Sequence, residues 1–375
     1  MFNKSIILAE TVFFCYQIFH YFLSNSRYSF KFQPLITLFP LIPDALIVAP
    51  TRELVQQIQR DFVKLCKGTD IAAEYVVGGH AVKHQLCKLE DGCNILVATP
   101  GRLNDFVGKG KINLENLKFL VLDEADRMLD MGFKEILDNL AHKMPAKEDR
   151  TTMMFSATFP DKVQDLGKEM LKDDYLFCTV GIVGGATETV TQEVIKCEKR
   201  EQFDKMQGML QVAKDKGDRI LIFVETKRQT DFTAAKLCQN DFPATSIHGD
   251  RQQMEREEAL RTFKSGETPV LVATNVAARG LDIPGVTHVI NMEMPKDIDE
   301  YVHRIGRTGR CGNKGKATSF FDEERDSEMA PHLVKILSNA KQVVPDFLQE
   351  LVGDGPSATA GGGGKNDAED DDDGW

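Results

Sequence analysis

The chain has 375 residues, of which 42% are hydrophobic and 27% are charged, and its formal net charge is -11. This length suits about two domains, and the composition is that of an ordinary soluble globular protein that can build a sizeable core. The negative charge neither supports nor excludes a polyanionic partner, because six of the acidic residues lie together near the carboxyl terminus, at 367, 369 and 370–373.

The eight cysteines exclude two kinds of site. None of them forms a Cys-x-x-Cys pair, and none has a zinc-like spacing to a histidine. We therefore predict reduced, mostly buried thiols in a cytosolic or nuclear protein.

Residues 1–44 differ from the rest of the chain because they are crowded with aromatic side chains. The run from 6 to 23 has nearly the length of a membrane span or of a signal-peptide core. Glu10, Gln17 and His20 interrupt this run, however, and no small-residue cleavage site follows it. We predict an atypical leader that lies outside the fold and does not cross a membrane.

From residue 45 onward, short apolar runs alternate with amphipathic segments. The first run, 45–49, leads through Thr51, a candidate helix cap, into a segment whose apolar residues share one helical face. Strands that alternate with helices predict an α/β fold with a mostly parallel sheet between helical layers. In this first domain, which we place at 45–180, further strands are expected at 75–77, 95–98, 119–122 and 153–155.

The apolar run 119–122 leads directly into an acidic cluster, D-E-A-D. The run predicts a strand buried on both faces, and open α/β sheets bind their ligands at the carboxyl ends of such strands. Asp123 is then suited to hold a magnesium ion through water, and Glu124 to orient and deprotonate an attacking water. The alternative needs no chemistry: both acids merely end a core strand, and Asp126 caps a helix that begins at Arg127.

Glycines at 181, 184 and 185 interrupt the alternation, and we place an interdomain linker at 181–190. A second α/β domain follows at 191–352. Residues 353–375 are rich in glycine and in acidic side chains, so they cannot bury a core and are predicted to be a disordered tail, with Trp375 either a partner anchor or flexible decoration. Strands of the second domain are expected at 219–224, 244–247, 270–273, 286–291 and 317–321.

The stretch V-H-R-I-G-R-T-G-R, at 302–310, interleaves a histidine and three arginines with glycines. Guanidinium groups beside glycine suit close, bidentate contact with phosphate, and a solvated basic face would not need Gly306 or Gly309. We predict a phosphate contact here, with a solvated basic face as the alternative.

A second polar turn, 273–284, follows a predicted strand at the ligand edge of the second sheet. Asp282 could accept a hydrogen bond from a ribose hydroxyl, and Thr274 and Arg279 could contact a nucleic-acid backbone. The alternative, a helix cap and a turn, would explain Asp282 but not the whole set.

Taken in order, these motifs resemble the DEAD-box RNA helicases of superfamily 2, and among them the Vasa group. In the first domain the matching pieces are P-T-R-E-L at 50–54, G-G at 78–79, T-P-G-R at 99–102, D-E-A-D at 123–126 and S-A-T at 156–158. In the second domain they are F-V-E-T at 223–226, Q-x-x-R at 253–256, the turn at 273–284 and H-R-I-G-R-T-G-R at 303–310.

The resemblance implies two tandem RecA-like domains that close over ATP while one RNA strand lies across both. It implies that closure bends the strand and expels its partner, and that hydrolysis reopens the cleft. Asp123 and Glu124 resemble the family's magnesium and water-activating carboxylates, and Arg307 and Arg310 its arginine fingers. Asp126, Ser156, Thr158 and His303 resemble the network that couples nucleotide state to closure, and Gly280 and Asp282 resemble nucleotide contacts. Contacts to the RNA backbone, without sequence specificity, carry over to Thr51, Arg52, Gly79, Thr99, Gly101, Arg102, Arg256, Thr274 and Arg279.

The sequence departs from the family at two motifs. It contains neither the adenine-reading glutamine motif nor a phosphate loop of the form G-x-x-x-x-G-K-[ST]. Without that loop the β- and γ-phosphates lose their main donors, and the first domain is expected to be truncated and to lack a central strand. We expect ATP turnover far below that of a complete relative. The chain is then either a truncated or mis-started helicase, or an ATPase-deficient RNA-binding or regulatory remnant.

A third hypothesis is a DNA-directed relative, which RNA and DNA of identical sequence would distinguish through 2'-hydroxyl contacts. The acidic tail resembles a Vasa-type terminus, which hints at germ granules. Monomer is the default oligomeric state.

Overall fold

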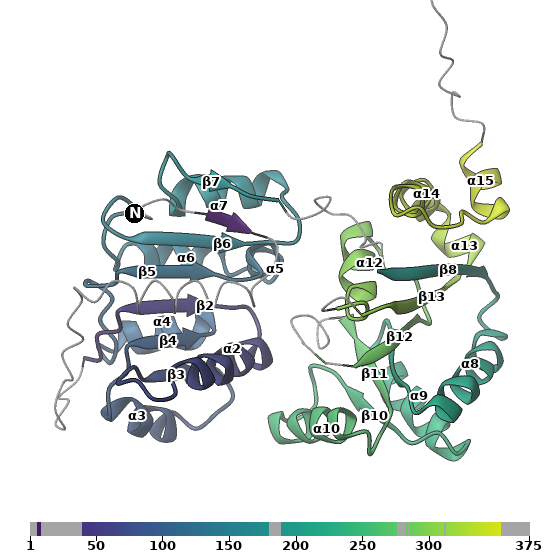
Figure 1. Ribbon diagram of the computed structural model, residues 1–375, viewed down its shortest axis with the longest axis horizontal. Helices are drawn as coiled ribbons and strands as arrows, with labels where there is room; N and C mark the ends of the chain where they lie inside the picture. The colour runs from purple at the N-terminus through teal and green to yellow at the C-terminus, as the bar shows by residue number, and fades with distance from the viewer. Residues whose placement is uncertain are drawn as a thin grey trace, which may run out of the picture.

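The computed structural model describes residues 40–179, 189–275, 283, 285–310 and 313–353, together with the backbone of 6–8. These residues form two α/β domains that lie side by side (Figure 1). Every strand pair among them is parallel, which confirms the predicted fold class. Among the described residues, none of the helices combines the length with the apolar composition that a membrane span needs.

Domain 1 contains a sheet that has seven strands within the described residues, in the order β3-β4-β2-β5-β6-β1-β7. Its strands are β1 (Ile6–Leu8), β2 (Ala45–Val48), β3 (Ala73–Val76), β4 (Ile95–Ala98), β5 (Phe119–Leu122), β6 (Thr151–Phe155) and β7 (Leu176–Phe177). Its helices are α2 (Arg52–Leu65), α3 (Val82–Glu90), α4 (Pro100–Gly108), α5 (Ala125–Asp130), α6 (Lys134–Ala141) and α7 (Asp161–Met170).

Domain 2 contains a sheet that has six strands within the described residues, in the order β10-β11-β9-β12-β13-β8. Its strands are β8 (Val190–Lys196), β9 (Arg219–Val224), β10 (Ala244–Ile247), β11 (Val270–Thr274), β12 (Val286–Asn291) and β13 (Gly315–Phe321). Its helices are α8 (Gln202–Lys216), α9 (Lys227–Gln239), α10 (Gln253–Ser265), α12 (Ile298–Ile305), α13 (Glu323–Asp326), η1 (Ser327–Met329), α14 (Ala330–Asn339) and α15 (Asp346–Val352).

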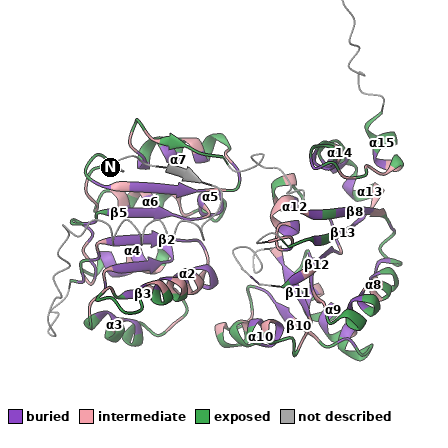
Figure 2. Ribbon diagram, viewed as in Figure 1, coloured by how far each residue is buried: buried purple, intermediate pink, exposed green. Residues whose placement is uncertain are grey.

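The central strands are buried on both faces, as their unbroken apolar runs predict (Figure 2). Along β2, Leu46 and Val48 belong to one core cluster, whereas Ala45 and Ile47 belong to the cluster on the other face. This alternation of faces is the period of two expected of a strand. Thr51 then caps α2 by accepting a hydrogen bond from the Leu54 amide at 3.4 Å, as predicted.

The prediction that the leader lies outside the fold is wrong for at least four of its residues. Ile6–Leu8 form β1, which pairs with β6 on one side and with β7 on the other. Leu41 is buried, and its backbone exchanges hydrogen bonds with Lys111 and Asn113 at 2.9 and 2.8 Å. Periodicity could not reveal β1, because three apolar residues in an aromatic-rich segment carry no alternation. Residues 1–5 and 9–39 of the leader lie outside the described residues.

All ten strands predicted from the sequence are present, with ends that differ by at most two residues. β7 and β8 were missed because each lies beside a predicted boundary rather than inside an apolar run. β8 begins at Val190, the last residue of the predicted linker. The rest of that linker up to 188, and the predicted tail after Gly353, lie outside the described residues.

Candidate functional site

The acidic cluster lies where β5 ends at the carboxyl edge of the first sheet. Asp123 is almost fully buried, and its Oδ1 accepts a hydrogen bond from the Glu124 amide at 3.0 Å. Glu124 adopts φ 51° and ψ 55°, in the left-handed region that residues with a side chain rarely occupy. Such strain amounts to about 1–3 kcal/mol and concentrates at functional sites. Helix α5 begins at Ala125, so the alternative that Asp126 caps a helix starting at Arg127 is wrong.

The side chain of Glu124 faces two arginines of domain 2. Burial raises the pKa of this carboxyl; the positive charge of Arg307 opposes the rise, Asp126 adds to it, and Arg310 opposes it. Oε2 of Glu124 is buried without a hydrogen-bond partner among the described residues. A carboxylate with a raised pKa and a vacant oxygen is suited to accept a proton from a small ligand.

Four residues predicted to couple the domains meet beside this carboxyl. Asp126 Oδ2 accepts hydrogen bonds from the Thr158 amide at 3.1 Å and from its hydroxyl at 2.9 Å. Ser156 Oγ accepts from the Asp126 amide at 3.3 Å and donates to the Thr158 carbonyl at 2.7 Å. His303 of domain 2 brings its Nε2 to 3.8 Å from the same Asp126 Oδ2. The structure therefore joins three residues of domain 1 to one of domain 2.

Helix α12 and the turn after it hold the two arginines. Arg307 Nε donates to the His303 carbonyl at 3.0 Å, and Arg310 Nε donates to the Gly306 carbonyl at 2.9 Å. Arg304, from the same motif, points elsewhere: it is buried, pairs with Glu300 and donates to the Glu293 carbonyl at 2.9 Å. Of the three arginines in this motif, Arg307 and Arg310 are the two whose positive charges lower the pKa of Glu124.

The glycines of this turn have a reason that sequence reasoning missed. Gly306 ends α12, and Gly309 has φ +70°. A Cβ at Gly309 would lie 2.6 Å from a methyl group of Val190. Glycine is required here by backbone conformation and by packing against β8, so the presence of Gly309 does not by itself indicate close phosphate contact.

The residues predicted to contact RNA on domain 1 follow three neighbouring strands, β3, β4 and β2. Because parallel strands end at one edge, these residues share one surface. The Arg52 guanidinium packs on Gly79, whose φ of +78° and lack of a Cβ permit this contact. Arg102 donates to the His80 carbonyl at 3.3 Å. At the start of α4, Thr99 is buried and Gly101 is exposed.

On domain 2, Arg256 lies in α10 and Thr274 ends the neighbouring β11, where it is buried. Arg256 forms an ion pair of 2.8 Å with Glu53 of domain 1, and Gln253 donates to the same carboxylate at 3.3 Å. Arg52 donates to Gln253 at 3.2 Å. The predicted contacts Arg279, Gly280 and Asp282 lie outside the described residues.

Several residues of this interface were missed. Glu257 accepts hydrogen bonds from Gln56 and Gln253, both at 3.2 Å, and its carboxylate lies 3.4 Å from His80 Nε2. Glu53 in the first turn of α2 looks like an ordinary helix-dipole acid. Its burial is seen only in the structure, and a sequence does not show which residue 203 positions later would neutralise it.

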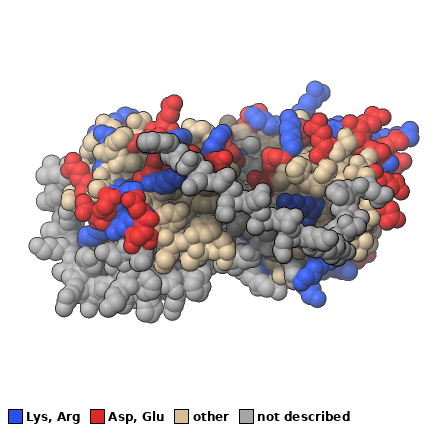
Figure 3. Space-filling model, turned by 90° about the horizontal axis from the view of Figure 1, so that it is seen from above, with Lys and Arg blue, Asp and Glu red and all other residues tan. Residues whose placement is uncertain are grey.

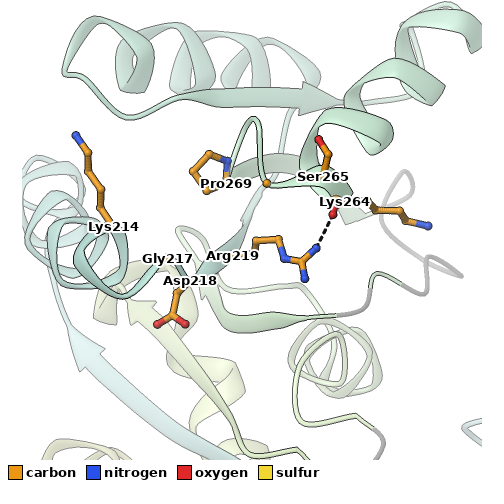
Figure 4. A pocket seen from close by; sticks show the side chains of 8 residues that line it. Lys214, Gly217, Asp218, Arg219, Lys264, Ser265 and Pro269 are labelled. Carbon is orange, nitrogen blue, oxygen red and sulfur yellow. Dashed lines mark hydrogen bonds between the residues drawn. The ribbon is translucent and has the colours of Figure 1, made fainter.

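On the face seen in Figure 3, charge is not segregated between the two domains. Figure 3 shows basic and acidic side chains on both domains of the face seen from above. A cavity of about 380 Å³ lies at the opposite, amino-terminal end of the second sheet, between the ends of α8 and α10 (Figure 4). There Arg219 donates to the Lys264 carbonyl at 2.8 Å. Because its lining residues lie at or before the starts of β9 and β11, this cavity is separate from the strand ends that carry the motifs.

A magnesium ion held through water fits the acids present. No group of three or more His, Cys, Asp or Glu side chains within the described residues could bind a metal directly. Magnesium usually keeps several waters and needs only one or two carboxylates besides phosphate oxygens. Asp123, at the tip of a rigid strand beside Glu124, can serve as such a carboxylate.

Two family models match the chain. The model described as DEAD/DEAH box helicase covers residues 11–166, and the Helicase conserved C-terminal domain covers 198–312. The first match starts at residue 11, within the predicted leader.

Curated relatives and solved structures agree with these models. The chain is 54% identical over 322 residues to "Probable ATP-dependent RNA helicase DDX4" of Pelophylax lessonae, with 85% of this chain and 44% of that protein covered. It is 48% identical to "ATP-dependent RNA helicase vasa" of Drosophila melanogaster, over 82% of this chain and 46% of that protein. The chain thus spans less than half the length of these relatives.

Among solved structures, Mss116p bound to ssRNA and AMP-PNP is 30% identical, with a TM-score of 0.77 over 91% of this chain and 70% of that chain. S. cerevisiae Dbp5 bound to RNA and ADP BeF3 is 26% identical, with a TM-score of 0.74 over 93% of this chain and 90% of that chain.

Proposed function

Because the chain belongs to the DEAD-box helicase family, we propose that it is an ATP-dependent RNA helicase whose two domains close on ATP and on one RNA strand. One observation carries this proposal. A single arrangement of the domains brings Glu124 opposite Arg307 and also brings Arg52 and Glu53 against α10. We call the part of the interface around Glu124 and Arg307 the nucleotide side, and the part where Arg52 and Glu53 meet α10 the strand side, after the RNA strand. Coupling requires that these two sides close together.

On the nucleotide side, Glu124 orients the attacking water and accepts its proton. Its raised pKa improves proton transfer, because a general base works best when its pKa lies near the working pH. Arg307 and Arg310 neutralise charge on the transferring phosphoryl group. Asp123 would hold a magnesium ion through water, and this ion would neutralise charge on the phosphates. Gly280 and Asp282 are proposed nucleotide contacts from the motif alone.

Domain closure is sensed through Asp126. Thr158 and Ser156 fix its carboxylate from one side, and His303 approaches from the other domain. Rotation of domain 2 would carry His303 away from Asp126 and the arginines away from Glu124 at the same time. Hydrolysis-competent geometry therefore exists only when the domains are closed.

On the strand side, the proposed RNA contacts are the residues that follow β2, β3 and β4, together with Arg256, Thr274 and Arg279. Backbone amides, hydroxyls and guanidinium groups at such positions bind phosphate and sugar without reading bases. A surface made by two domains at once can bend the bound strand and displace its partner. We propose local duplex unwinding on this ground.

The phosphate loop has no counterpart in the sequence, so no residue of domain 1 is assigned to cradle the β- and γ-phosphates. We propose that ATP turnover by the 375-residue chain is correspondingly slow, while RNA binding is retained.

The test is binding of fluorescently labelled single-stranded RNA, and of DNA with the same sequence, in the presence of AMP-PNP and magnesium. We expect RNA to bind tighter than DNA, and phosphate release from ATP to rise when RNA is added. Equal affinity for both strands would favour the DNA-directed alternative. Lack of binding to either strand would refute the proposed function.

A further inference from the structure

Asp231 of α9 collects three hydrogen bonds from the end of β10 and the turn that follows it. Its Oδ1 accepts from Ser246 Oγ at 2.6 Å and from Arg251 at 3.0 Å, and its Oδ2 lies 2.9 Å from His248 Nε2. Ser246 and His248 are buried. Burial alone would raise the pKa of the Asp231 carboxyl, but the hydrogen bonds from Ser246, Arg251 and His248 outweigh burial and lower it.

These three donors surround the turn that leads into α10. The turn is closed by a hydrogen bond of 3.2 Å from the Arg251 amide to the His248 carbonyl. Lys227, one helical turn before Asp231 on α9, pairs with Asp250 at 2.5 Å. Two side chains of α9 that lie one helical turn apart therefore hold this turn in place. Helix α10 starts immediately afterwards, at Gln253.

The start of α10 is the part of domain 2 that contacts the strand side of domain 1. Gln253 and Arg256 both bond to Glu53, and Glu257 accepts from Gln56. A shift of about 1 Å in this helix would break all of these contacts, because hydrogen bonds weaken steeply away from 2.7–3.2 Å. None of the contacts that Asp231 makes with the described residues reaches domain 1, so α10 is the element that links its turn to the domain interface.

We propose that Asp231 is a positioning residue: it holds the turn 246–251 against α9 so that α10 presents Gln253 and Arg256 in the geometry that closes on RNA. This inference rests on the proposed function. Asp231 lies outside every recognised motif, and it would nevertheless have a role in RNA binding on the strand side.

Removal of the carboxylate would leave buried polar groups without partners. His248 Nδ1 has no hydrogen-bond partner among the described residues, so Asp231 is the only partner shown there for the imidazole ring. Ser246 would also lose its acceptor. Because buried donors cannot stay unsatisfied, the turn is expected to move until water reaches them.

The test uses the full chain and labelled single-stranded RNA with AMP-PNP. We expect Asp231→Ala to bind RNA about fivefold more weakly, a coupling typical of groups in one network. Asp231→Asn keeps the shape and one acceptor oxygen, and is expected to lose about twofold. Glu258→Gln is the matched control, because it removes one negative charge and an exposed ion pair from α10 and should leave affinity unchanged.

A double-mutant cycle separates positioning from general loss of stability. If Asp231 acts through α10, Asp231→Ala should have little further effect in an Arg256→Ala background. Melting temperatures identify any variant that is unfolded under the assay conditions, and in that case Asp231→Asn carries the cycle. The proposal is overturned if a folded Asp231 variant binds RNA like the wild type, or if its effect and that of Arg256→Ala multiply. Wild-type chain that binds no RNA would instead refute the proposed function, and this inference with it.

Discussion

The two sides of the domain interface close in different ways. On the strand side, side chains of the two domains bond directly: Glu53 to Arg256 at 2.8 Å and Arg52 to Gln253 at 3.2 Å. On the nucleotide side, His303 and Asp126 are 3.8 Å apart, and Glu124 keeps a buried oxygen without a partner among the described residues. On the strand side, these polar groups find their partners within the protein. On the nucleotide side, a carboxylate oxygen is left for a ligand to bind.

This difference separates what each side controls. Direct bonds across the strand side contribute to the free energy of closure, so their loss should lower RNA affinity. The unsatisfied carboxyl on the nucleotide side contributes no such bond, and burial makes it destabilising to the folded protein. Loss of the Glu124 carboxyl should therefore change the rate of ATP turnover but not the affinity for RNA. Three variants can break or sharpen this comparison.

The largest effect is expected from Glu124→Gln. The amide keeps the shape but cannot accept a proton, and removal of a general base lowers turnover by about 100-fold or more. Phosphate release from labelled ATP with saturating RNA measures the effect, and the variant also defines the baseline for the slow turnover expected of this chain. RNA affinity should remain unchanged.

Glu135→Gln is the matched control for this variant, because Glu135 is an exposed acid on α6 of the same domain. It should release phosphate at the wild-type rate. If Glu124→Gln instead kept its turnover, or lost RNA affinity, the division between the two sides would be wrong.

A smaller effect is expected on the strand side. Glu53→Gln and Arg256→Ala each remove one partner of a largely buried ion pair, which leaves the other charge uncompensated when the domains close. Each should weaken RNA binding in the presence of AMP-PNP by about tenfold. The double variant should be no weaker than the worse single variant, because both act on one contact.

The exposed pair on α10, Glu258 and Arg261, provides the comparison for this cycle. Glu258→Gln and Arg261→Ala should change affinity by less than about twofold, since surface pairs contribute little. Additive effects of Glu53→Gln and Arg256→Ala would show that the two residues do not act together.

The difference between the sides also explains which features could be predicted from the sequence. The acidic cluster 123–126 directly follows an apolar strand, so its place at the sheet edge follows from local pattern. The fold class follows from the alternation of strands and helices. The pairing of Glu53 with Arg256 spans 203 positions and depends on how the domains meet, which no local pattern encodes. β1 was missed because pairing on both edges, and not its own sequence, makes three residues a strand.

The smallest effect concerns stability and follows from the raised pKa of Glu124. Because the folded protein binds this proton more tightly than the unfolded chain does, the unfolded chain loses it first as pH rises. Stability from this group is thus fully present below its ordinary pKa and is lost as pH rises through the raised value. Glu124→Gln has no such proton, so its melting temperature should increasingly exceed that of the wild type as pH rises above the ordinary pKa of a glutamate. If the melting temperatures of the two proteins changed with pH in the same way, the Glu124 carboxyl would not lie in a destabilising site. In that event the folded protein would not have the raised pKa on which the proposed role of Glu124 as a general base depends.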